Sequence, residues 1–223
     1  MDKTKIKDIT FGLLFKKSFR IMDMWGSIAD DILRKDKYFS PRYFPSIQSQ
    51  YNLQGQLSNP ETGNYLLLSA ENLIYRHSIE KKFDEEFKLF RERISKYLVP
   101  DIVYENHLEV IRVGLVYSHI LEQEEVDKFI SNVFKPSVKG LSDFRYSKKE
   151  PVTTGGTIKG VNDYNNKIYT VGSLGEGNKG ITYDYQLIFS PHRECINDII
   201  EKFLLNSYSS FEKEMGSLVV GQG

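Results

Sequence analysis

The sequence has little of what several specialised protein classes require. Its 223 residues hold one cysteine, Cys195, and one tryptophan. A single thiol cannot form an internal disulfide or a multi-thiolate zinc site, so neither is expected. Thirty basic residues balance thirty acidic ones. No net charge therefore draws the chain to nucleic acid or to anionic lipid.

Long apolar runs are also missing. The run at residues 65–68 is far shorter than a membrane span requires. Residues 1–7 are charged, and the apolar residues 11–15 are too short for a signal-peptide core and are followed at once by Lys16 and Lys17. We therefore expect a cytoplasmic protein without membrane contact.

Motifs that carry chemistry are weak. The four histidines show no metal-type spacing, and Cys195 has no recognisable base or orienting partner. Residues 175–180, GEGNKG, match the dinucleotide pattern GxGxxG, but an alternating strand follows where the mechanism requires a helix. We interpret them as a hairpin tip. No cofactor, no metal site and no catalytic residue is predicted.

Hydrophobic periodicity predicts the order of the elements. The expected strands are residues 10–20, 53–57, 65–69, 73–77, 111–119, 141–148, 167–174 and 181–190. The expected helices are residues 25–33, 84–99, 126–134 and 191–215. Pro100, Pro136 and Gly216 are expected to end the last three. Residues 38–45 predict a packed loop, and residues 150–167 have no periodicity.

Hairpins that alternate with one-sided helices predict an α+β fold. We expect an antiparallel or mixed sheet, with amphipathic helices packed mainly on one face. No linker divides the chain, so residues 1–223 are expected to form one domain. Residues 1–106 and 107–223 remain candidates for two related halves.

The strand predicted at residues 111–119 is apolar on both faces, which is typical of a central strand. Gly114 in its middle predicts a bulge or the close approach of a neighbouring element. Arg112, Tyr117 and His119 are the first candidates for a binding site there. By strand alternation, Arg112 points away from the face that the other two share.

Two groups of cations lie close to aromatic residues, an arrangement that suits single-stranded nucleic acid. The first group is Lys16, Lys17 and Arg20 beside Phe19. The second group is Lys148, Lys149, Lys159 and Lys167. Since the net charge is zero, ordinary solvated faces are favoured over a nucleic-acid surface.

Residues 110–120, VIRVGLVYSHI, resemble a signature of a sporadically distributed, uncharacterised prokaryotic protein family of similar length. The signature reads Arg-hydrophobic-Gly-Leu-Arg-Tyr-hydrophobic-Asn, and Arg112, Gly114, Leu115 and Tyr117 match it. Val116 stands in place of the second arginine and His119 in place of the asparagine. The resemblance implies a patchy distribution, as in mobile-element or defence gene cassettes, and no known activity.

Three functions follow from these observations. The first is a non-enzymatic protein-binding or assembly module that acts with a partner protein or as a homodimer, because Tyr-rich surfaces suit interfaces. The second is a small-ligand-binding protein or enzyme with a cleft at the central strand. The third, not favoured, is a nucleic-acid-binding accessory protein.

Overall fold

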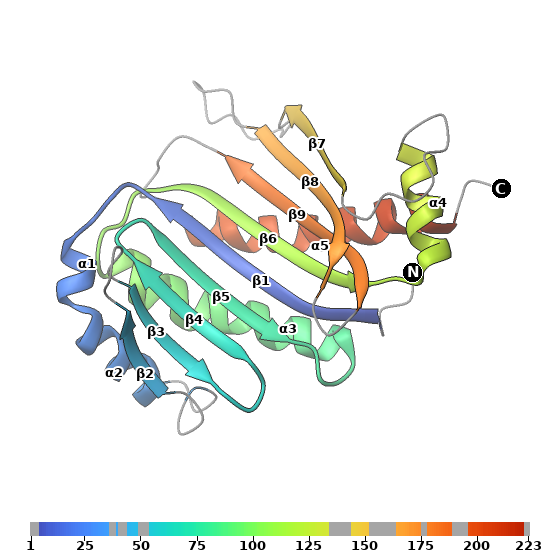
Figure 1. The fold of residues 1–223 in the computed structure, drawn as a ribbon. Coiled ribbons are helices and arrows are strands. Elements are labelled where there is room, and N and C mark those ends of the chain that lie inside the picture. Colours follow the sequence, from blue (N-terminus) through green and yellow to red (C-terminus); the bar gives the residue numbers. More distant parts are fainter. Residues whose placement is uncertain are drawn as a thin grey trace.

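The fold is a single antiparallel sheet with helices on one side. The computed structural model describes residues 5–35, 39, 44–48, 54–133, 144–151, 164–174, 178–188 and 196–220. Within these residues nine strands form one sheet in the order β2-β3-β4-β5-β1-β6-β9-β8-β7 (Figure 1). The predicted α+β class is confirmed, and each strand pair is antiparallel.

Most predicted elements are present. The strands are β1 (Ile6–Phe15), β2 (Phe44–Gln48), β3 (Gln54–Asn59), β4 (Asn64–Ser69), β5 (Asn72–Ser78), β6 (Val110–Ile120), β7 (Phe144–Pro151), β8 (Tyr164–Ser173) and β9 (Lys179–Ile188). The helices are α1 (Arg20–Asp23), α2 (Trp25–Lys35), α3 (Phe83–Arg93), the π-helical η2 (Ile94–Tyr104), α4 (Gln123–Val133) and α5 (Ile196–Val220). No described helix is long and apolar enough to cross a membrane.

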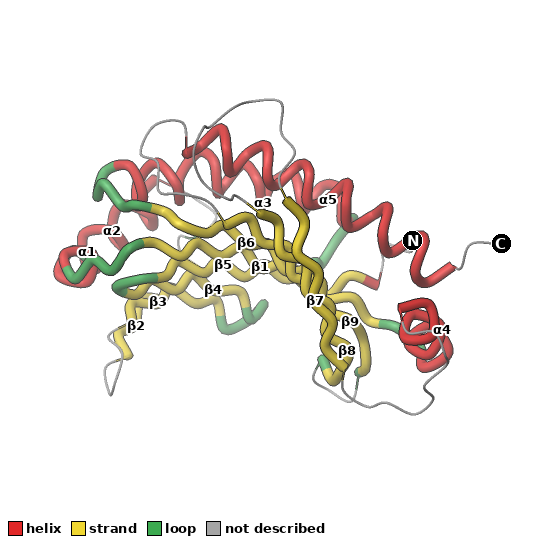
Figure 2. The backbone as a smooth tube through the Cα atoms, turned by 90° about the horizontal axis from the view of Figure 1, so that it is seen from above, coloured by secondary structure: helices red, strands yellow, loops and turns green. Residues whose placement is uncertain are grey.

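The sheet bends like an arch. Figure 2 shows α1, α2, α3 and α5 on the outer, convex side, with α4 beyond one end of the sheet. Alternate residues of the central strands point into the helix layer and form the core; on β1 these include Ile9, Phe11 and Leu13. The other alternate set faces the concave side. We call this side the open face, because the described helices do not cross it.

Stacked aromatic side chains hold the helix layer to the sheet. The Tyr117 ring of β6 stacks on Phe211 of α5, with ring centroids 4.3 Å apart. Tyr208 of α5 packs against Phe83 and Phe87 of α3, at 5.4 Å and 5.0 Å. Each such pair adds about 1 kcal/mol beyond the burial of its area. The high Phe and Tyr content of the chain therefore serves the core as well as the surface.

The same order of elements occurs twice. A strand, one or two helices, several further strands and a long helix occupy residues 6–104, and a similar series occupies 110–220. In each series the first strand pairs with the last, β1 with β5 and β6 with β9, and β1 pairs with β6 at the centre. The idea that residues 1–106 and 107–223 are related units stays a prediction. The shared order of elements and the equivalent strand pairings are what two related halves would require.

Two predicted helix ends are wrong. The Phe-rich helix does not end at Pro100 but continues as η2, in which Glu105 donates its N–H to the Pro100 carbonyl five residues back. The wider π-helical turn accommodates a proline that lacks an N–H and would clash in an α-helix. The last helix continues through Gly216 to Val220, and Gly216 does not adopt a positive φ that would end it.

Three predicted segments are also corrected. Within the predicted packed loop 38–45, Phe44 and Pro45 belong to edge strand β2, a position that tolerates proline. The first strand ends at Phe15 rather than at residue 20, and α1 then begins at Arg20. The aperiodic stretch 150–167 begins and ends in strand, since β7 reaches Pro151 and β8 starts at Tyr164. Residues 152–163 lie outside the described part of the chain.

Candidate functional site

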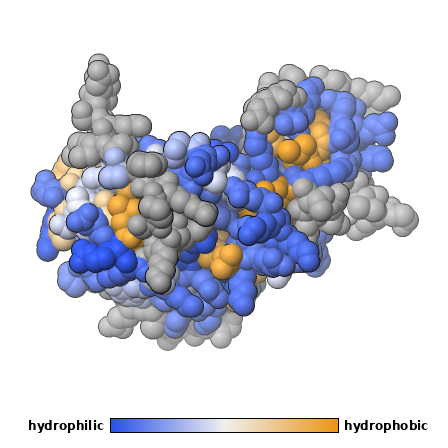
Figure 3. Space-filling view, turned by 90° about the horizontal axis from the view of Figure 1, so that it is seen from below, coloured by the Kyte–Doolittle hydropathy of each residue, from blue (hydrophilic) through white to orange (hydrophobic). Residues whose placement is uncertain are grey.

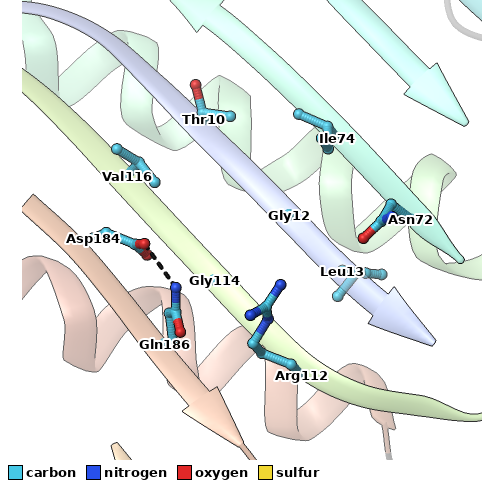
Figure 4. Close-up of a pocket in the computed structure, with 10 residues that line it drawn as sticks. All are labelled: Thr10, Gly12, Leu13, Asn72, Ile74, Arg112, Gly114, Val116, Asp184 and Gln186. Atoms are coloured by element: carbon cyan, nitrogen blue, oxygen red, sulfur yellow. Dashed lines mark hydrogen bonds between the residues drawn. The ribbon is translucent and has the colours of Figure 1, made fainter. Parts of the chain in front are cut away.

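A hollow of about 190 Å³ lies at the centre of the open face. Thr10, Gly12, Asn72 and Ile74 line it from the first half, and Arg112, Gly114, Val116, Asp184 and Gln186 line it from the second (Figure 4). These residues come from four adjacent strands, β5, β1, β6 and β9. We call it the central hollow.

Two glycines create the space. Gly12 of β1 pairs directly with Gly114 of β6, so two side chains are missing at neighbouring positions. No backbone bulge occurs there, because the irregularities between these strands lie between Ile6 and Asp8 and between Leu14 and Phe15. The prediction for Gly114, a bulge or the close approach of a neighbouring element, is therefore wrong, since a Cβ there would also meet no atom closer than 3.8 Å. The glycine instead keeps the centre of the open face empty.

The glycine pair also marks an approximate twofold axis through the sheet. The register exchanges Gly12 with Gly114, Thr10 with Arg112, Asn72 with Asp184 and Ile74 with Gln186. The hollow thus has two walls built on equivalent backbone positions. The first wall is uncharged, whereas the second carries a guanidinium and a carboxylate.

Asp184 is the most perturbed group of the central hollow. Burial raises the pKa of its carboxyl, against the lowering effects of the Gln186 amide, of Arg112 and of Arg145. The Gln186 side-chain N–H donates to Oδ2 of Asp184 at 2.7 Å, and Asn166 of β8 donates to the Gln186 carbonyl at 3.3 Å. Oδ1 of Asp184 lies 3.9 Å from where a Cβ of Gly114 would stand. Its second oxygen therefore faces the empty space.

Arg112 approaches the same space from the other side. Figure 4 shows its guanidinium reaching along β6 toward Gly114, opposite to Asp184. Within the described residues this guanidinium makes no hydrogen bond or ion pair. Arg76, which also stands on the open face, instead donates to Asp8 at 2.9 Å, and the Ser118 hydroxyl donates to the same carboxylate at 2.8 Å. The structure therefore pairs Arg76 with a carboxylate and leaves the Arg112 guanidinium available to a ligand.

The sequence candidates do not form one site. Arg112 lies in the central hollow, but Tyr117 and His119 point into the helix layer and are 0 % and 2 % exposed. Burial raises the pKa of the Tyr117 hydroxyl. The His119 ring meets Phe211 edge-on at 6.4 Å. The structure therefore places Tyr117 and His119 in the core, behind the sheet.

Two buried polar clusters occupy the helix side of the sheet. In the first half His77 of β5 shares a hydrogen bond of 2.8 Å with Glu86 of α3, and burial lowers the pKa of His77 against the raising effect of that carboxylate. In the second half Glu214 of α5 accepts hydrogen bonds from Lys167 and Tyr169 of β8. Both clusters tie a strand to a helix, and neither opens onto the central hollow.

The predicted cationic groups do not form one surface. Lys16 pairs with Glu109 at 2.6 Å and Lys17 with Glu71 at 3.4 Å, so acidic neighbours offset their charge. Lys167 is buried in the helix layer. Lys159, His192 and Cys195 lie outside the described residues, as do residues 175–177 of the GxGxxG match. The rest of that match confirms the hairpin, since Ser173 pairs with Lys179.

Sequence reasoning missed Asp184 and Gln186. Each is the polar partner of an apolar neighbour in an alternating strand, a pattern that also describes an ordinary solvated face. The available signal was the glycine in the middle of two central strands, Gly12 and Gly114, because glycine weakens a strand unless close approach or open space is needed.

The central hollow offers several groups that can bind a ligand. It offers an available cation, a desolvated carboxylate and apolar rims at Ile74 and Val116. Among the described residues, no group of three or more His, Cys, Asp or Glu is placed to hold a metal ion. Comparison with protein-family models and with curated proteins found no match.

Proposed function

We propose that the chain is a non-enzymatic protein-binding module, and that the open face of its sheet receives the partner. The carrying observation is the composition of this face. Half-buried apolar side chains alternate there with polar ones on five adjacent strands, and the described helices leave them uncovered. The apolar members are Leu14, Leu67, Ile74, Val116 and Ile188.

This mixture fits a partner surface better than a solvated face or a core. An antiparallel sheet that only meets water carries polar residues on its outer side. An interface needs apolar area at its centre with polar groups around it. Seen from below, which is along the sheet rather than onto the open face, the described surface is mostly hydrophilic, with apolar side chains in separate patches (Figure 3).

A matched pair of variants tests this proposal. Leu67→Glu with Ile188→Glu puts charges on the open face, on both sides of the central hollow. Leu89→Glu with Leu205→Glu puts the same charges on α3 and α5, where these side chains are 45 % and 47 % exposed. Wild type and both variants are used to capture proteins from a lysate of the encoding organism, and native mass spectrometry reports any second copy.

The expected result is a partner retained by wild type and by the α3/α5 variant but lost by the open-face variant. A partner retained equally by all three would place the binding surface elsewhere. No partner and no second copy on wild type would overturn the proposal.

A further inference from the structure

We propose that the central hollow binds a small free zwitterion of the size and charge pattern of an α-amino acid. Arg112 would hold the anionic group, and Oδ1 of Asp184 would hold the cationic group. This inference does not depend on the protein-binding proposal, because a free small molecule is its ligand.

The first argument is charge complementarity. The central hollow brings together one cation and one carboxylate. Neither makes a direct ion pair within the described residues, and Arg112 and Arg145 act on Asp184 only at longer range. A ligand with only one charge would pair with one of them and leave the other unpaired in a partly desolvated site, which is costly. A ligand that carries both charges satisfies both.

The second argument is spacing. Arg112 stands opposite Ile188, whereas Asp184 stands opposite Val116, four residues further along β6. Four residues of strand span about 13 Å. The long Arg112 side chain closes much of this distance by reaching toward Gly114, and Asp184 faces the same glycine. The two charges therefore approach one glycine-lined space from opposite ends, which is the arrangement that a ligand with both charges requires.

The third argument is that the hollow is built and not a packing defect. A Cβ at Gly114 would make only ordinary contacts, the shortest at 3.8 Å from Gln186, so the fold does not require glycine there. Alanine or valine would suit a strand better. The Gln186 and Asn166 amides hold Asp184 in place, although burial disfavours its charge. Desolvated charged groups held in this way are typical of binding sites.

The apolar rim adds a side-chain preference. Ile74 of β5 and Val116 of β6 border the hollow from opposite sides of β1. A volume of about 190 Å³ accommodates a backbone zwitterion with a small or medium aliphatic side chain. We therefore expect alanine, valine or leucine to bind better than aromatic or charged amino acids.

Ligand-observed NMR followed by calorimetry tests the inference. The twenty L-amino acids are screened at millimolar concentration. The best aliphatic binder is then compared with its N-acetyl derivative, which lacks the cation, and with its amide, which lacks the anion. We expect only the parent zwitterion to bind measurably. Equal binding of either derivative, or no amino acid binding to wild type, would overturn the proposal.

Three variants locate the ligand. Arg112→Gln and Asp184→Asn each remove one charge and are expected to weaken binding about thirtyfold. Gly114→Val fills the space and is expected to abolish binding, with circular dichroism confirming that the fold is kept. Arg20→Gln, an exposed arginine of α1 away from the open face, is the control and should change affinity less than about threefold. Unchanged binding by Gly114→Val would place the ligand outside the central hollow.

The outcomes of the two proposals are separable. Loss of zwitterion binding in Gly114→Val while partner capture persists would leave the protein-binding proposal standing. If Leu67→Glu abolishes partner capture while zwitterion binding stays intact, the zwitterion site is separate from the partner surface. Either proposal can therefore fail while the other stands.

Discussion

The two halves of the sheet share a backbone plan but differ in the chemistry that they bring to the centre. Across the approximate twofold axis, Thr10 stands where Arg112 does, and Asn72 stands where Asp184 does. The first half therefore supplies hydroxyl and amide groups, and the second supplies both charges. The shared backbone plan of the two halves sets the shape of the central hollow. The side chains that differ between the halves set what the hollow can bind.

The helix side shows a parallel contrast. The first half buries a histidine against a glutamate, His77 and Glu86, and the second buries a lysine against a glutamate, Lys167 and Glu214. Because burial lowers the pKa of His77, this imidazole is neutral at neutral pH, whereas Lys167 forms an ion pair with Glu214. The two clusters should respond differently to the same kind of substitution.

The largest expected effect comes from removing one carboxylate of each cluster. Glu214→Gln leaves the buried Lys167 ammonium without its counter-charge and should lower the free energy of unfolding by about 3 kcal/mol. Glu86→Gln keeps a hydrogen-bonding group beside neutral His77 and should cost about 1 kcal/mol. Urea denaturation measures both, with exposed Glu212→Gln as the control. An equal cost at Glu86 would show that His77 is charged in the folded state.

The next effect is a dependence of stability on pH in the first half. As the pH falls, His77 of the unfolded chain gains a proton near its ordinary pKa of about 6.5, whereas His77 of the folded protein gains it only at a lower pH. Stability is therefore present above pH about 6.5 and is lost as the pH falls through and below that value. His77→Gln should flatten the stability change between pH about 7.5 and about 5.5. A profile identical to wild type would contradict this assignment.

A smaller effect should appear when the charge of the central hollow is removed. Because burial raises the pKa of Asp184, its ionised form destabilises the folded state, and this cost is present above the folded pKa and vanishes at low pH. Asp184→Asn should thus raise the melting temperature at neutral pH. Asn72→Asp, the equivalent position across the axis, should lower it. Differential scanning fluorimetry compares the two, and a loss of stability in Asp184→Asn would refute the desolvation argument.

The smallest effect is expected at the glycine pair. Neither Gly12→Ala nor Gly114→Ala brings a methyl group closer than 3.8 Å to a neighbouring atom. Each should change the free energy of unfolding by less than about 1 kcal/mol. A greater destabilisation at one glycine only would show that the two halves are not equivalent in backbone geometry.

The fold was predictable from sequence where local pattern and tertiary packing agree. Alternation along β6 and β9, and the spacing of Phe83, Phe87 and Phe90 on α3, predict their elements correctly because each has one strongly apolar face. Edge strand β2 was missed, since its proline indicates a break in the chain. The helix was wrongly predicted to end at Pro100, because a π-helical turn depends on packing that local sequence does not report.

The candidate site was only partly predictable. Arg112 was identified, and alternation correctly placed it on the face opposite Tyr117 and His119. Its companions Asp184 and Gln186 lie more than seventy positions further along the chain. They join it only through the β6–β9 pairing. Strand order is a property of the whole fold, so no local pattern could bring these groups together.

The central β1–β6 ladder has a consequence for how the chain folds during synthesis. β1 finds β5 early, but its other edge must wait for β6, whose paired residues lie about a hundred positions later. A nascent first half therefore carries a long apolar strand with a bare hydrogen-bonding edge, which is the kind of template that recruits other chains. Folding yield, more than final stability, should depend on how quickly the ribosome delivers residues 110–120.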